Sequence, residues 1–81
     1  MTRMRAIDLA KTKPTGYIQF NWAAELYKRD DKAPSYDGRK VHYTHVSFRW
    51  DDFLNKQVVV FVLKNGKKYY ISGESLVKVY E

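Results

Sequence analysis

Basic and aromatic side chains are interleaved along several stretches of this chain, and they are its best candidates for a functional site. Cations can follow the phosphates of a single-stranded nucleic acid while exposed rings stack on its bases, each for roughly 1–3 kcal/mol. The competing interpretation is that rings such as Phe48, Trp50 and Tyr69 are core, and that the lysines protect a sheet edge. The first interpretation predicts a nucleic-acid-binding surface formed by Lys64, Lys67, Lys68, Tyr70, Arg49, Arg39, Lys40 and Tyr36.

The net charge of the chain agrees with an anionic partner. The charge is +6 at neutral pH and the sequence pI is about 9.6, and no block of five like charges occurs. Such a balance favours contact with nucleic acid. It is also ordinary for a small soluble domain, where a net charge of about 2–8 is common. Charge therefore supports the binding hypothesis but does not establish it.

Residues that could perform catalysis or bind a metal are few. The two histidines, His42 and His45, are three residues apart on an expected strand, so they should point to opposite faces and fail to chelate one ion. The chain has no Cys. The paired acids at 30–31 and 51–52 lie in polar turns, where acids are usually solvated or cap a backbone N–H. We therefore predict a protein that is not an enzyme, with no cofactor and no metal.

Length and composition set the class of protein. The chain has 81 residues, which predicts a single domain over 1–81. The first residues lack the apolar region of a signal peptide, and no apolar run reaches the roughly 20 residues of a membrane span. The absence of Cys fits a reducing compartment. The expectation is a soluble, cytoplasmic protein that does not contact a membrane.

A hairpin near the C-terminus is the clearest structural signal. Asn65-Gly66 lies between apolar runs and predicts a two-residue type I′ turn, because both residues tolerate positive φ. In that register Leu63 faces Lys68 and Val62 faces Tyr69. One face of the hairpin would then carry Val58, Val60, Val62, Tyr69 and Ile71, and the other Val59, Phe61, Leu63, Lys68, Tyr70 and Ser72.

The remaining chain reads as further short strands. Residues 41–50 alternate, with Val46, Phe48 and Trp50 expected on one face together with His42 and Thr44. Residues 16–22 read as a strand and 76–80 as the last one, whereas 22–28 fit either strand or helix. Residues 1–15 are expected to form a short strand or one helical turn with a mobile start, and 28–40 a long exposed loop. Asp51 could cap the N–H groups of Phe53 and Leu54.

Together these elements predict a mainly β fold, with a small α+β arrangement as the alternative. We expect a bent antiparallel sheet or an SH3-like or OB-like small barrel that contains the Asn-Gly hairpin. The stretch from Asn55 to Ser75 resembles the middle hairpin of SH3-like and Sm-like barrels, but it covers about a quarter of the chain and no second Sm-type motif accompanies it.

Two functions of different classes remain open. The first is nucleic-acid binding through the basic and aromatic surface described above. The second is a protein-interaction or inhibitor protein, for example a phage-encoded one, that binds a host protein by an apolar face or a sheet edge, or that forms a homodimer.

Overall fold

The structure, a computed structural model, describes residues 2–20, 24–29 and 39–80. One seven-stranded antiparallel sheet with the order β1-β7-β2-β4-β5-β6-β3 forms most of the fold, and one short helix accompanies it. The mainly β, bent antiparallel sheet expected from the sequence is therefore confirmed. Its elements are β1 (Thr2–Arg5), α1 (Ala6–Thr12), β2 (Gly16–Phe20), β3 (Leu26–Arg29), β4 (Lys40–Asp51), β5 (Lys56–Leu63), β6 (Lys68–Ser72) and β7 (Leu76–Tyr80).

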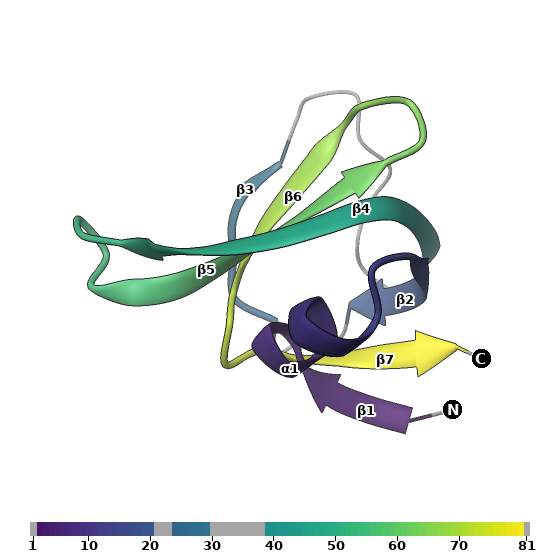
Figure 1. The fold of residues 1–81 in the computed structure, drawn as a ribbon, viewed down its shortest axis with the longest axis horizontal. Helices are drawn as coiled ribbons and strands as arrows, with labels where there is room; N and C mark the ends of the chain where they lie inside the picture. The colour runs from purple at the N-terminus through teal and green to yellow at the C-terminus, as the bar shows by residue number, and fades with distance from the viewer. Residues whose placement is uncertain (1, 21–23, 30–38, 81) are drawn as a thin grey trace.

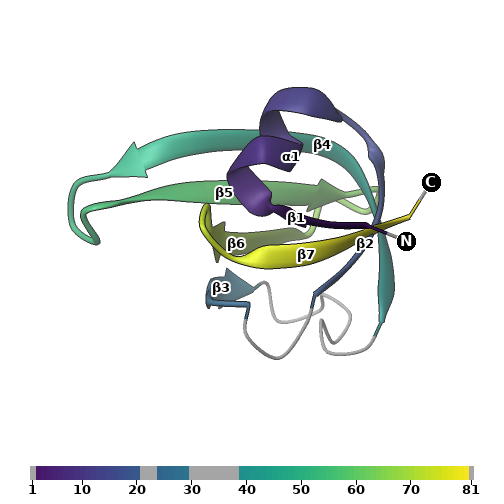
Figure 2. The same ribbon diagram turned by 90° about the horizontal axis from the view of Figure 1, so that it is seen from below.

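The sheet bends so strongly that its inner face encloses a core, with α1 lying against one side (Figures 1 and 2). Aromatic rings fill the middle: Phe20 lies 5.0 Å from the ring of Tyr69, and Tyr43 lies 5.0 Å from the ring of Phe61. Both pairs are edge-to-face, the arrangement that aromatic quadrupoles favour. The helix adds Leu9 and Ala6, which are fully buried. Large rings thus supply the buried area that a chain this short needs.

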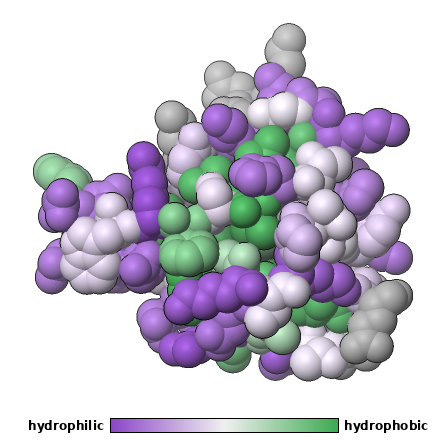
Figure 3. All heavy atoms as spheres, viewed as in Figure 1, coloured by the Kyte–Doolittle hydropathy of each residue, from purple (hydrophilic) through white to green (hydrophobic). Residues whose placement is uncertain are grey.

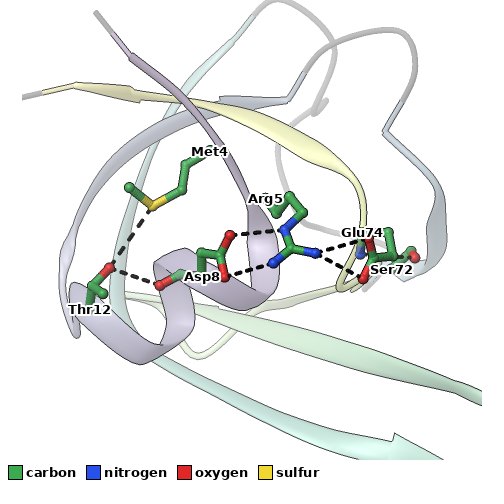
Figure 4. A network of polar contacts seen from close by, with 6 residues as sticks. All are labelled: Met4, Arg5, Asp8, Thr12, Ser72 and Glu74. Atoms are coloured by element: carbon green, nitrogen blue, oxygen red, sulfur yellow. Dashed lines mark hydrogen bonds and ion pairs between the residues drawn. The ribbon is translucent and has the colours of Figure 1, made fainter.

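The N-terminal segment forms both a strand and a helix, where the sequence predicted one or the other. β1 pairs with β7, and the N–H of Ala6 donates to the carbonyl of Ser75 at 2.9 Å. Figure 4 shows Arg5 between Asp8 of the helix, at 2.9 Å, and Glu74 of the β6–β7 turn, at 3.3 Å. The hydrogen bond from Arg5 holds the pKa of the Asp8 carboxyl below its usual value. Mobility of the first residues stays a prediction.

The segment between 16 and 40 contains two strands that bound the predicted loop. β2 is the expected strand, with Ile18 and Phe20 buried. Of residues 22–28, for which the sequence left strand or helix open, residues 26–28 are in a strand, because β3 spans Leu26–Arg29 and pairs with β6. The predicted loop of residues 28–40 is shorter at both ends, since 28–29 belong to β3 and Lys40 begins β4. Residues 21–23 and 30–38, including Asp37-Gly38, lie outside the described residues.

The C-terminal hairpin forms as predicted, but its register is wrong by one residue. Val62 faces Lys68 and Phe61 faces Tyr69. The loop has three residues, because the N–H of Leu63 donates to the carbonyl of Lys67 at 2.8 Å. Gly66 has a φ of +86°, whereas among the described non-glycine residues only Asn55 has a positive φ. A turn with glycine alone in the left-handed region closes a hairpin with a bulge, not a type I′ turn.

This shift exchanges the two faces of one strand relative to the other, because side chains alternate along a strand. Tyr69 and Ile71 are fully buried beside Val59 and Phe61, in the core. Tyr70 and Lys68 lie on the opposite side of the sheet with Val60 and Val62. We call this side the outer face. The predicted faces, which joined Tyr69 to Val60, are therefore wrong.

A bulge at Thr44 breaks the predicted alternation of β4. Tyr43 faces Leu63, but His45 already faces Val62, so Thr44 is an extra residue. Before the bulge Tyr43 points into the core; after it Val46 does. His42 and His45 consequently both lie on the outer face, and the expectation that they point to opposite faces is wrong. For the same reason His42 does not share a face with Val46, Phe48 and Trp50.

Candidate nucleic-acid interface

The first group of predicted residues meets at the end of the sheet where β4 begins and β5 ends. Arg39, Lys40 and Lys64 line an open groove of about 490 Å³, together with Val41, His42, Leu63 and Asn65. Arg39 and Lys40 come from the start of β4, and Lys64 begins the β5–β6 turn. Cations that are 24 residues apart in sequence thus face one hollow.

A stack of rings continues this groove across the sheet. Tyr17 on β2 faces His42 on β4, and their rings are stacked at 4.4 Å with an interplanar angle of 14°. The ammonium of Lys40 lies 4.9 Å from the centre of the Tyr17 ring and 4.6 Å from that of Tyr80. Tyr17 is 45% exposed. The groove therefore has an accessible aromatic surface with a cation held above it.

Sequence analysis did not select Tyr17, His42 or Tyr80. Their signal was present: in a period-two strand Tyr17 falls on the side opposite Ile18 and Phe20, so an outward ring was foreseeable. Their meeting was not, because it depends on the antiparallel pairing of β2 with both β4 and β7. Cross-strand pairing of this kind joins segments that no local pattern connects.

The other two lysines lie beside the groove. Lys67 ends the hairpin loop, and its N–H donates to the side-chain oxygen of Asn65 at 3.0 Å. Lys68 is exposed on the outer face in one row with Val62 and His45. Only Lys64 of the three lysines lines the groove, but all three belong to the same end of the hairpin.

Arg49 and Tyr70 lie further along the outer face. With Tyr27, Asp51, Leu54 and Val58 they line a second groove of about 190 Å³. Val58 is almost completely buried although it lies outside the core cluster, so neighbouring side chains cover it on the outer face. Tyr36, the remaining predicted residue, lies outside the described residues.

The two grooves are connected by cross-strand rows. From the first groove toward the second, the rows on β4, β5 and β6 are His45–Val62–Lys68, then Ser47–Val60–Tyr70, then Arg49–Val58–Ser72. Outward residues on one strand are about 6.6 Å apart. The outer face thus forms a strip with rings at both ends, in which the exposed cations Lys68 and Arg49 border the buried residues Val58, Val60 and Ser72. Its described carboxylates lie at the far end: Asp51 faces Lys56, and Lys56 forms an ion pair with Glu25 at 3.2 Å.

Other aromatic residues are exposed on a different surface. β4 and β5 extend beyond the rest of the sheet, to the left in Figures 1 and 2. We call residues 47–57 the arm. Phe48 is 44% exposed, Trp50 53% and Phe53, at its tip, 96%. Phe48 and Trp50 face away from the outer face, opposite Val59 and Gln57. Neither is the core residue that the competing interpretation assumed, whereas Tyr69 is.

The acids and histidines that the structure describes do not gather into a metal-binding cluster. Among the described residues no three His, Asp or Glu side chains lie close enough to hold a metal ion. Asp51 accepts the N–H of Leu54 at 3.0 Å, so the predicted cap is confirmed for that residue.

Within the described part of the chain, no helix is long and apolar enough to span a membrane.

Comparisons with known proteins add no further constraint. No family model, curated protein or solved structure matches this chain. The argument for function therefore depends on the geometry of the described residues.

Proposed function

We propose that this chain is a non-catalytic module that binds single-stranded nucleic acid along the outer face of β4, β5 and β6. The observation that supports the proposal is the strip itself. The cations selected from sequence alone come from three separate segments: Arg49 and Lys68 lie in the cross-strand rows of the outer face, and Lys40 and Lys64 line the first groove at the end of those rows. A merely solvated set of charges would be spread over all faces.

The rings suggest which part of the ligand each end would contact. The exposed Tyr17–His42 stack offers a flat surface to one base, and base stacking on an aromatic ring contributes roughly 1–3 kcal/mol. Lys40, held over the Tyr17 ring, would meet the adjoining phosphate. Tyr70, half-buried in the second groove, offers a second and more restricted contact.

Single strands suit this surface better than duplexes. Rings can stack only on bases that are already unstacked, whereas a duplex would present its phosphates and engage the cations alone. The two grooves are open and run across strands. No described helix projects from the outer face as a helix that enters the groove of a duplex would. The proposal therefore favours single-stranded DNA or RNA.

The test is fluorescence anisotropy with labelled single- and double-stranded oligonucleotides, at low and near-physiological salt. Binding of single strands should persist at the higher salt and should quench Tyr or Trp emission. Lys67→Glu combined with Lys68→Glu should abolish binding while thermal unfolding stays cooperative. Tyr17→Ala should weaken binding roughly 5- to 150-fold, the loss of one stacked base.

A matched pair of lysine variants separates a specific strip from general attraction to a basic protein. Lys64→Ala removes a cation from the strip, and Lys11→Ala removes one from α1, behind the sheet; both are exposed. Lys64→Ala should lower the slope of log K against log salt by about 1, and Lys11→Ala should leave it unchanged. Equal effects, or binding seen only at low salt, would refute the proposal.

Protein interaction is the second candidate function, and the arm is the observation that favours it. Its exposed rings lie on the other side of the sheet from the basic strip, so they are not available to the same ligand. A phage-encoded inhibitor of a host protein stays a prediction that a pull-down from host lysate would test.

A further inference from the structure

The arm has a sheet edge that no described strand pairs with, and α1 approaches it through Lys11, whose ammonium lies 5.7 Å from the centre of the Phe48 ring. β2 pairs with β4 only from Lys40 to Tyr43, and β5 pairs with it along the other side as far as Asp51. Among the described residues no strand pairs with β4 from Thr44 to Asp51 on the β2 side. An unpaired edge exposes the N–H and C=O groups of about every second residue, which is a template for another strand.

This edge differs from the two others of the sheet. β1 and β3 are the outermost strands, and each has four residues that include two bases. Short, charged edges are a common protection against pairing with other chains. The edge of β4 is longer and carries Val46, Phe48 and Trp50 on one side. In Figure 3 apolar side chains reach the surface over the middle of β4, with polar ones around them.

We propose that this edge pairs with the same edge of a second copy of the chain, antiparallel and across a two-fold axis at Phe48. The partner is identified by self-complementarity. In that register Phe48 faces Phe48, Val46 faces Trp50 and His45 faces Asp51, so apolar residues meet on one side. On the outer side Ser47 faces Arg49, and no like charges are opposed. Cross-strand pairs of this kind each stabilise a sheet.

Neighbouring registers lack this complementarity. An axis at Arg49 sets Arg49 against Arg49, which opposes like charges, and an axis at Ser47 sets Trp50 against Thr44 in place of an apolar residue. Like charges directly opposite each other are destabilising.

The charges of the arm also favour a second copy. Arg49 and Lys56 balance Asp51 and Asp52, so the arm is neutral although the chain carries +6. An acidic partner would be recognised by a basic arm. Pairing through a neutral projection instead keeps two strongly basic bodies apart. This proposal does not depend on nucleic-acid binding, because it rests on the unpaired backbone edge and its apolar side chains, although Ser47 and Arg49 also belong to the outer face.

The experiment is sedimentation velocity over a concentration series without nucleic acid. A mass rising from 9.6 kDa toward twice that value is expected. Phe48→Glu places two carboxylates at the axis and should raise the dissociation constant of the dimer more than tenfold. Phe53→Glu alters the more exposed ring at the tip, outside the paired residues, and should leave it unchanged. Circular dichroism confirms that both variants are folded.

Substitutions of Ser47 by residues of opposite charge test the register, because they should change the dissociation constant of the dimer in opposite directions. Ser47→Glu creates an ion pair with Arg49 of the other copy, and Ser47→Lys creates a repulsion. Each contact occurs twice, so the dissociation constant should fall or rise roughly 2- to 30-fold. Thr2→Glu and Thr2→Lys make the same changes of charge at an exposed position on β1, at the other edge of the sheet, and serve as controls. A chain that stays monomeric at millimolar concentration, or equal effects of both Ser47 variants, would overturn the proposal.

Discussion

The two halves of β4 belong to one strand but have different surroundings. From Lys40 to Tyr43 the strand pairs with β2, and Tyr43, which also pairs with Leu63 of β5, is fully buried with its hydroxyl donating to the carbonyl of Lys13 at 2.8 Å. From His45 to Asp51 the strand pairs with β5 alone, and Trp50 is half exposed. The bulge at Thr44 marks the change. One strand therefore serves as core at one end and as a projecting surface at the other.

The difference has a physical cause that can be stated residue by residue. Aromatic side chains stabilise the fold only where other groups surround them, and β2, which pairs with β4 beside Tyr43, does not extend along β4 to Trp50. A large ring left half exposed forgoes much of the hydrophobic free energy it could contribute. Large rings that remain exposed together mark a surface for interaction.

The largest expected effect is the loss of stability when a buried ring of β4 is removed, compared with the loss when an exposed ring of the same strand is removed. Tyr43→Ala should destabilise the protein by about 3–5 kcal/mol, because it leaves a cavity beside Phe61 and an unpaired carbonyl at Lys13. Trp50→Ala should cost only about 0.5 kcal/mol, as at other exposed sites. Urea unfolding of both variants at low protein concentration measures the difference. Similar losses would mean that the arm packs as tightly as the core.

The sequence predicted the alternation of β4 but not the place where it changes phase. Val41 and Tyr43 are buried, and so is the side of Val46 that faces the core, yet nothing local marks Thr44 as the extra residue. A bulge is set by the strands on either side, which the sequence does not align. The same reason explains the hairpin: Asn65-Gly66 located the turn, but Gly66 alone takes the positive φ and shifts the register.

The candidate site was predicted in its chemistry and not in its assembly. Lys40 and Lys64 were selected as cations, and both line the first groove. That Arg49 belongs with Tyr70 in the second groove follows from the pairing of three strands. The stack of Tyr17 on His42 was missed for the same reason. The type of each residue can be read from the sequence, whereas which residues lie together depends on how the strands of the sheet pair.

An effect of intermediate size is the pH dependence of the stability that the buried Tyr43 contributes. Burial raises the pKa of the Tyr43 hydroxyl to about 12, above the value of 10.0 that it has when exposed in the unfolded chain. The folded state therefore keeps its proton where the unfolded state loses it. The stabilisation is complete below pH 10 and declines as the pH rises from about 10 to 12, by up to about 2–3 kcal/mol.

Tyr43→Phe is the matched variant for this prediction. At neutral pH it should lose about 1 kcal/mol, the hydrogen bond to Lys13. It cannot ionise, so its stability relative to wild type should rise between pH 10 and 12. Denaturant unfolding of both proteins at each pH gives the difference, and other titrating groups cancel. A constant difference across this range would show that Tyr43 ionises as readily in the folded protein as in the unfolded one.

The smallest expected effect concerns the contact between the arm and the helix. The ammonium of Lys11 lies 5.7 Å from the centre of the Phe48 ring, and an exposed cation–π contact of this kind contributes about 0.5–1 kcal/mol. Lys11→Gln should lose that amount and Lys11→Arg should retain it, as measured by urea unfolding. In a Phe48→Leu background Lys11→Gln should have no effect, because the ring is gone; the double-mutant cycle isolates the pair. Equal losses in both backgrounds would place the contribution of Lys11 elsewhere. The arm would then be held by its backbone pairing alone, and its rings would be free to turn toward a second copy.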